Sequence, residues 1–145
     1  MSERIKVLFL CTANACRSQM AEGWARHLKS DVIDAYSAGV KPDKVSSRAI
    51  AVMKETGVDI SGHHSKHVND LAKIEFDYVI TVCGNAHESC PIFPGKTKVV
   101  HVGFDDPAAA TGTPEEVSAV FRKIRDQIRD FIVTLPDSIE KRKVK

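Results

Sequence analysis

The chain has no hydrophobic run long enough to cross a membrane and no strong excess of charge of either sign. Its first apolar stretch, in MSERIKVLFLC, covers about six residues and is broken by Lys6, which is too short for a signal peptide or a membrane span. The formal net charge is +2, which gives no reason to expect binding to nucleic acid or to an anionic surface. These absences favour a cytoplasmic protein without a membrane or nucleic-acid partner.

The cysteines are not spaced as a zinc site. No C-x2-C pair occurs among Cys11, Cys16, Cys83 and Cys90, and such pairs are the usual signature of structural zinc. Three histidines within residues 63–67 fit a polar loop better than a ligand set, so no metal is expected. Cytoplasmic thiols stay reduced, which favours catalytic or redox roles for these cysteines over structural disulfides.

The chain also lacks internal repeats, low-complexity tracts and linkers. Its 145 residues are expected to form one domain, 1–145, of which residues 136–145 are a basic, frayed tail. Apolar runs predict strands at 5–10, 32–37, 76–82 and 98–102. Helical periodicity predicts helices at 18–29, 46–57 and 117–135, and a short helix at 69–74.

Strands that alternate with helices predict right-handed crossovers and a parallel sheet with helices on both faces. We therefore expect an α/β fold, a three-layer sandwich built on a four-stranded parallel sheet. Ligands in such folds lie at the carboxyl ends of the strands. Cys11 ends the first strand, Cys83 ends the third, and Asp105 and Asp106 follow the fourth, so these residues are predicted to share one rim.

Residues 4–29 carry the most specific motif, C-x5-R-S, on a strand-to-helix turn. A helix N-terminus presents unpaired N–H groups and a partial positive charge, so the turn predicts a loop that binds a phosphate-like anion. The expected binding residues are Thr12, Ala13, Asn14, Ala15, Cys16, Arg17 and Ser18. Chance pairing of a cysteine with an arginine is the alternative, and the flanking strand and helix disfavour it.

Each end of this loop has an expected role. The field that favours an anion also favours thiolate, so the pKa of Cys11 is expected to lie below that of free cysteine. Arg17 offers a planar fork that can hold two oxygens. Ser18 is expected to cap the helix and to donate to the Cys11 sulfur.

Cys83 and Cys90 lie seven residues apart. A regular helix would separate them by about 10.5 Å, whereas a disulfide needs Cα atoms within about 4.4–6.8 Å. If they bond, the segment must unwind, and Gly84 and Pro91 would help it bend. The alternative is two buried, inert cysteines.

Asp106 precedes Pro107, which biases it toward an extended backbone. A carboxylic acid at this point could protonate a leaving oxygen if burial and a nearby anion raise its pKa. The alternative is an Asx-type turn, which is common before proline.

At this point the motifs are recognisable as a set. CTANACRSQMAEGWA, YSAG, the Cys83/Cys90 pair and GFDDPA together resemble the thioredoxin-coupled arsenate reductases, which share the fold of the low-molecular-weight protein tyrosine phosphatases. The resemblance covers about residues 4 to 135. It implies reduction of arsenate to arsenite, with thioredoxin as the electron donor, in a protein expected to be a monomer.

The resemblance also implies a relay of three cysteines. Cys11 attacks arsenate, while Arg17 and the loop hold the oxygens and Asp106 protonates the leaving hydroxide. Cys83 then attacks the Cys11 sulfur and arsenite leaves with the electron pair. Cys90 attacks Cys83, which frees Cys11 and leaves a Cys83–Cys90 disulfide for thioredoxin. Cys16 is not one of the three essential cysteines and is interpreted as a small packed residue.

The chain departs from this family in its loop, which often reads CTGNSCRS. Here Ala13 replaces the glycine and Ala15 the serine, and Ala13 would be strained if its φ had to be positive.

Some family members bind potassium beside the loop. Asn14, Glu22 and Ser37 match three of the ligands, but the fourth position falls near Lys66. The sequence therefore predicts no cofactor, and the hypothesis is that the Lys66 ammonium takes the place of the ion near Glu22.

Two other functions use the same loop. A low-molecular-weight tyrosine phosphatase needs only Cys11, Arg17 and Asp106, but Ala108–Ala110 stand where those phosphatases carry tyrosines that wall the substrate ring. Weak phosphatase activity is still expected, because arsenate and phosphate are near-isosteres. A non-catalytic oxyanion-binding or thioredoxin-binding module would not need Asp106 at all.

Overall fold

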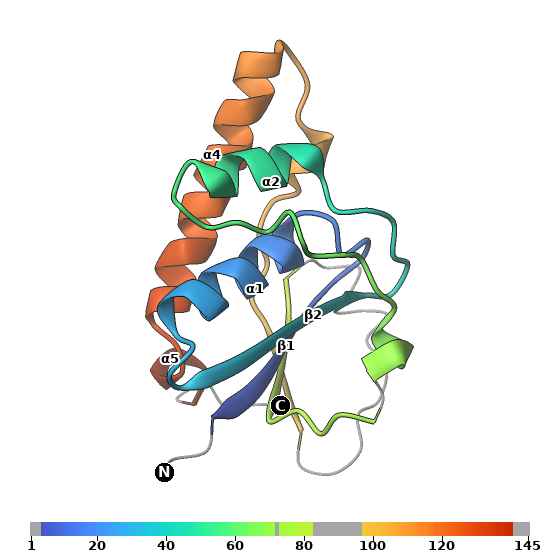
Figure 1. Cartoon of the computed structure of the whole chain (residues 1–145), viewed down its shortest axis with the longest axis vertical. Coiled ribbons are helices and arrows are strands. Elements are labelled where there is room, and N and C mark those ends of the chain that lie inside the picture. The colour runs from blue at the N-terminus through green and yellow to red at the C-terminus, as the bar shows by residue number, and fades with distance from the viewer. Residues whose placement is uncertain (1–3, 72, 83–96, 141–145) are drawn as a thin grey trace.

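The computed structural model describes residues 4–71, 73–82 and 97–140, and these contain a four-stranded sheet (Figure 1). Its strands are β1 (Ile5–Cys11), β2 (Ile33–Gly39), β3 (Tyr78–Thr81) and β4 (Lys98–His101). The spatial order is β2-β1-β3-β4, and every neighbouring pair is parallel. The predicted parallel α/β sheet is confirmed, with β3 and β4 shorter than the apolar runs that predict them.

Helices follow the strands along the chain. They are α1 (Arg17–Leu28), α2 (Ser47–Lys54), α4 (Pro114–Val133), α5 (Asp137–Glu140) and the short 3-10 helices η1 (Val68–Leu71) and η2 (Pro107–Ala109). Thr113 and Glu116 form a reciprocal capping box that starts α4. Among the helices in the described part of the chain, none is both long and apolar enough to cross a membrane.

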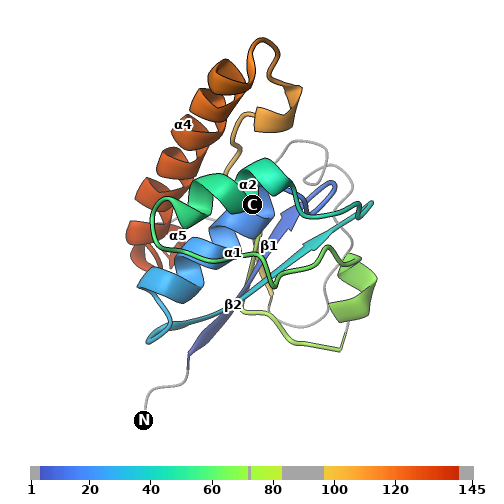
Figure 2. The same ribbon diagram turned by 45° about the horizontal axis from the view of Figure 1, so that its top comes forward.

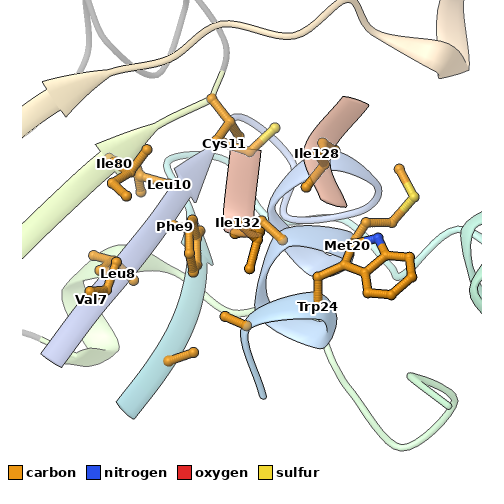
Figure 3. Close-up of a cluster of buried hydrophobic side chains, with 14 of the residues drawn as sticks. Val7, Leu8, Phe9, Leu10, Cys11, Met20, Trp24, Ile80, Ile128 and Ile132 are labelled. Carbon is orange, nitrogen blue, oxygen red and sulfur yellow. The ribbon is translucent and has the colours of Figure 1, made fainter. Parts of the chain in front are cut away.

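The core lies between the sheet and the two longest helices. Figure 3 shows Phe9 of β1 facing Ile132 of α4, with Met20 and Trp24 of α1 beside them. Phe9, Met20 and Ile132 are fully buried. The Trp24 indole donates to the Arg125 carbonyl at 3.2 Å, which links α1 to α4. This packing holds α1 firmly against β1, and the loop between them carries the candidate site.

Three expectations about helices are corrected. The helix predicted at 69–74 is the 3-10 turn η1. The helix predicted at 46–57 is shorter, because α2 ends at Lys54, and the Ser46 side chain caps its start. The frayed tail does not begin at residue 136, because α5 continues the fold and Ile139 is 1% exposed.

The site lies where the strands end. Cys11 of β1 pairs in register with Gly39 of β2. After β4 the chain runs on beside the end of β3, because Val102 and Phe104 donate to the carbonyls of Thr81 and Val82. Figure 2 shows the segment before α4 returning past this end of the sheet. Residues 102–106 are therefore brought to the rim on which Cys11 lies.

Candidate active site

The loop between β1 and α1, residues 12–16, is held from outside by its carbonyl groups. Four backbone N–H groups of residues 40–46 donate to it. These are Val40, Lys41, Asp43 and Ser46, which bond the carbonyls of Cys11, Thr12, Ala13 and Ala15 at 3.2, 2.8, 3.0 and 3.0 Å. The Asn14 carbonyl accepts from the side chains of Gln19 and Ser65 at 3.1 and 2.8 Å.

This arrangement sets the direction of the N–H groups. The C=O and N–H groups of a trans peptide point in opposite directions, so carbonyls that face residues 40–46 and 65 turn the next N–H groups to the other side. Within the described residues, the N–H groups of residues 13–16 have no protein acceptor. They line a ring at the start of α1, where the helix dipole adds positive potential, and this ring suits a tetrahedral anion.

Asn14 is the strained residue of the loop. Its φ is +52°, and it is the one non-glycine residue with positive φ in the described ranges, a conformation that asparagine tolerates better than most residues. Ala13 would be strained only with a positive φ, and its φ is not positive. Asn14 is fully buried, and its side-chain amide donates to the Ser18 hydroxyl at 2.8 Å.

Ser18 does not cap α1. The helix begins at Arg17 with Cys16 at the N-cap position, and no side chain caps it. Ser18 therefore lies inside the first turn, where its buried oxygen accepts from Asn14. A helix N-terminus without a side-chain cap keeps its N–H groups available for a ligand, which is the physical reason for the departure.

Arg17 reaches from the loop to the segment after β4. Its Nη1 donates to the Phe104 carbonyl at 3.0 Å, and its Nη2 lies 3.6 Å from Asp106 Oδ2. The guanidinium Nε is buried and has no hydrogen-bond partner within residues 4–71, 73–82 and 97–140. Since an unpaired buried donor is costly, this N–H indicates that an acceptor belongs beside it, and an oxyanion in the loop would supply one.

The sequence allows two interpretations of Asp106, an Asx-type turn and a proton donor, and its two carboxylate oxygens have different partners. Its Oδ1 accepts from the Ala108 N–H at 3.0 Å in an Asx-type cap of η2, and its Oδ2 faces Arg17. Its backbone is extended (φ −80°, ψ 109°), as the following proline predicts. The side chain is 45% exposed, so the carboxyl group is accessible to solvent beside Arg17.

Cys11 and Cys16, at the two ends of the loop, are both buried. Cys11 ends β1 and is 3% exposed (Figure 3). Cys16 is equally buried, and burial raises the pKa of its thiol, although a hydrogen bond with Ser46 opposes the shift. A protonated, packed Cys16 agrees with its expected structural role.

The structure thus brings together the Cys11–Ser18 loop and Asp106, while Cys83 and Cys90 lie outside the described residues. Sequence reasoning missed Gln19 and Gly39. Gln19 is fully buried and donates to the carbonyls of Asn14 and His64. A polar residue next to Met20 on the inward face of α1 was the available signal.

An anion loop after a β-strand, a cysteine at its start, an arginine at its end and an aspartate across its mouth define a class of enzymes. Members of this class bind tetrahedral oxyanions and attack them with a thiolate. The chain belongs to the low molecular weight phosphotyrosine protein phosphatase family, whose model matches residues 6–145.

Within that family, the chain is similar to proteins named arsenate reductase. The chain is 46% identical over 132 residues to an arsenate reductase of Halalkalibacterium halodurans, which covers 91% of this chain and 95% of the relative. It is also 46% identical over 122 residues to an arsenate reductase of Bacillus subtilis, covering 84% and 88% of the two chains.

Solved structures of arsenate reductases have the same fold as this chain. An arsenate reductase in an oxidized state superposes with a TM-score of 0.78 at 32% identity, covering 92% of this chain and 98% of the other. An arsenate reductase in a phosphate-binding state gives 0.75 at 33% identity, covering 93% and 98%. A thioredoxin-dependent arsenate reductase of Corynebacterium glutamicum gives 0.68 at 28% identity, covering 94% of this chain and 64% of that one.

Proposed function

We propose that this protein reduces arsenate to arsenite through a relay of Cys11, Cys83 and Cys90, with thioredoxin or a similar dithiol protein as the electron donor. The observation that carries the proposal concerns donors without partners among the described residues. The buried Nε of Arg17 has no acceptor there, and neither do the N–H groups of loop residues 13–16 beside it. An oxyanion in this loop would satisfy both sets of donors. The relatives named arsenate reductase supply the choice of arsenate.

The first step uses residues of the described site. The Cys11 thiolate attacks arsenic while Asp106 gives a proton to the departing oxygen, so that water leaves and a thiolate–arsenate ester remains. Arg17 has to release Asp106 and turn an edge of its guanidinium, where the in-plane N–H donors lie, to the oxyanion. The 3.6 Å separation from Asp106 is longer than a hydrogen bond, so this pairing is easily exchanged for the anion.

The later steps balance two electrons. Cys83 attacks the Cys11 sulfur, the As–S electron pair stays on arsenic, and arsenite leaves as a Cys11–Cys83 disulfide forms. Cys90 then attacks Cys83 and releases Cys11 as thiolate. The dithiol donor reduces the resulting Cys83–Cys90 disulfide and is itself oxidised. The C. glutamicum neighbour is described as thioredoxin-dependent, which supports this choice of donor.

The test is arsenate-dependent NADPH oxidation with thioredoxin and thioredoxin reductase. We expect turnover by the wild type, one stalled turnover by Cys90→Ser and none by Cys11→Ser. Asp106→Asn should lower kcat by about 100-fold or more. Asp105→Asn is the matched control and should leave kcat unchanged, because among the described residues it is Asp106, not Asp105, that faces Arg17. Repeated turnover by Cys90→Ser would exclude the relay.

Phosphatase activity is the second candidate, because Cys11, Arg17 and Asp106 are all that hydrolysis of a phosphate ester requires. The loop after Asp106 continues Pro107-Ala108-Ala109, with both alanines exposed, and offers no aromatic wall for a substrate ring. We expect slow hydrolysis of p-nitrophenyl phosphate. Rapid hydrolysis without arsenate reduction would favour the phosphatase.

A further inference from the structure

A buried carboxylate lies behind the anion loop. Glu22, on α1, is 4% exposed and accepts a short hydrogen bond from the Ser37 hydroxyl. Arg26 Nε lies 2.8 Å from its Oε2, and Lys66 Nζ lies 4.0 Å from its Oε1. His63 Nε2 is 3.8 Å away. A carboxylate at this depth needs compensating charge.

His63 is not the compensating cation. Burial lowers the pKa of its imidazole, although the charge of Glu22 opposes the shift, and its Nδ1 is engaged with Gln19 Oε1 at 2.9 Å. The positive charge therefore comes from Arg26 and Lys66. Burial also lowers the pKa of Lys66, again opposed by Glu22.

Only one of these two cations is also joined to the anion loop. The Lys66 N–H donates to Asn14 Oδ1 at 3.1 Å, and the Lys66 carbonyl accepts from the Gly39 N–H at 2.8 Å. Arg26 instead bonds the Ala35 carbonyl within β2. The Arg26 side chain is 58% exposed and that of Lys66 is 20% exposed, so solvent screens the arginine more strongly.

The potassium ion bound by some family members does not fit these residues. The Asn14 Oδ1 is occupied by the Lys66 N–H, and the Ser37 hydroxyl is directed at Glu22. A cation placed among these oxygens would meet the Lys66 ammonium, whose charge repels it. The Lys66 ammonium also donates to the His64 carbonyl at 3.2 Å, so it is the ammonium that disfavours a potassium ion at this point.

We propose that Lys66 is a positioning residue that replaces a bound metal cation: its ammonium neutralises Glu22 while its backbone holds Asn14 in the shape that binds the oxyanion. The inference rests on the proposed oxyanion site, but it concerns anion affinity rather than reduction. It predicts that the loop binds its anion equally well with any monovalent cation in solution. The Glu22 cluster opens into a cavity of about 210 Å³ lined also by Arg26 and Tyr36, so dissolved cations have access to it.

The experiment measures the affinity for inorganic phosphate by thermal shift, in potassium, sodium and choline chloride at equal ionic strength. Wild type should give one affinity in all three salts. Lys66→Met should lose about tenfold or more in every salt, because the buried Glu22 then keeps only the more exposed Arg26 as counter-charge. Lys66→Arg should recover most of that loss. Arg26→Met is the matched control, expected to stay within about threefold of wild type because Arg26 does not touch the loop.

A variant with the opposite charge at position 66 gives a second, independent measurement. Lys66→Asp supplies an oxygen ligand where the ammonium was, so its melting temperature and phosphate affinity should rise with potassium chloride and not with choline chloride. This comparison is made within one variant, so it remains informative if Lys66→Met is poorly folded.

Some outcomes would overturn the inference. Wild-type affinity that rises specifically with potassium, or a folded Lys66→Met as tight as wild type, contradicts it. Loss of affinity in Arg26→Met equal to that in Lys66→Met would also contradict it. If the phosphate results hold but arsenate is not reduced, the proposed function fails and the role of Lys66 stands.

Discussion

A single methyl group added at Gly39 should displace the anion loop. An ideal Cβ at this position would lie 2.6 Å from the Thr12 carbonyl oxygen, 3.0 Å from the Asn14 nitrogen and 3.1 Å from the Ala13 carbonyl carbon. All three are backbone atoms, so no side-chain rotation relieves the contact. Gly39→Ala therefore tests whether the exact position of the loop controls anion binding.

The expected magnitude follows from these distances. Ordinary contact begins near 3.4 Å, so the Thr12 carbonyl has to retreat by about 0.8 Å. Overpacking of this kind costs about 1–3 kcal/mol, or roughly 2–12 °C in Tm at about 2–4 °C per kcal/mol. Donors that hold an oxyanion must lie within about 2.7–3.1 Å of it. Loss of one charge-assisted bond, about 1.5–3 kcal/mol, should weaken phosphate binding by about 10- to 100-fold.

The assay compares Gly39→Ala with Gly62→Ala, in which the added methyl group meets nothing within 4 Å. Gly62→Ala should keep the wild-type phosphate affinity and change stability by less than about 1 kcal/mol. Thermal shift with and without phosphate reads both quantities in one experiment. A Gly39→Ala variant with wild-type Tm and wild-type phosphate affinity would refute the reasoning.

Three further predictions concern stability. Hydrogen bonds from Arg122 lower the pKa of Glu55 from 4.5 to about 2, so the stabilisation from this exposed pair is present above pH 4.5 and is lost as the pH falls toward 2. In urea unfolding, Glu55→Gln should therefore be less stable than wild type at pH 6 and should match it near pH 2. Ile128→Ala, at a fully buried site, should cost about 2–5 kcal/mol in urea unfolding, and a cost below 1 kcal/mol would contradict the described core. Thr113→Ala removes the cap that accepts from Glu116 and should cost about 1 kcal/mol, measured as a shift in the urea midpoint at constant m-value.

Much of the fold was predictable because the strand and helix patterns are local. The apolar run at 5–10 and the periodicity of 117–135 correspond to β1 and α4, which pack together in the core. Prediction was weakest at short elements. The segment at 69–74 forms only a 3-10 turn, and the helix predicted at 46–57 already ends at Lys54, because the extent of a short element depends on what it packs against.

The candidate anion loop could also be predicted from the sequence, since C-x5-R-S requires only contiguous residues between one strand and one helix. The prediction that Ser18 caps α1 rested on residue type alone and was wrong. The helix begins at Arg17, and the Ser18 hydroxyl accepts from the Asn14 amide instead. The roles predicted for Cys83 and Cys90 remain proposals, because both residues lie outside the described ranges.

The sequence by itself determined the identity and order of the reactive groups, because the strand, loop and helix that carry Cys11 and Arg17 form within residues 4–29. Only the tertiary structure decided how these groups are oriented. The Phe104 carbonyl that holds Arg17 comes from 87 positions away, and part of the counter-charge of Glu22 comes from Lys66. Contacts of this range depend on the close packing of several elements at once, which no local pattern of residues encodes.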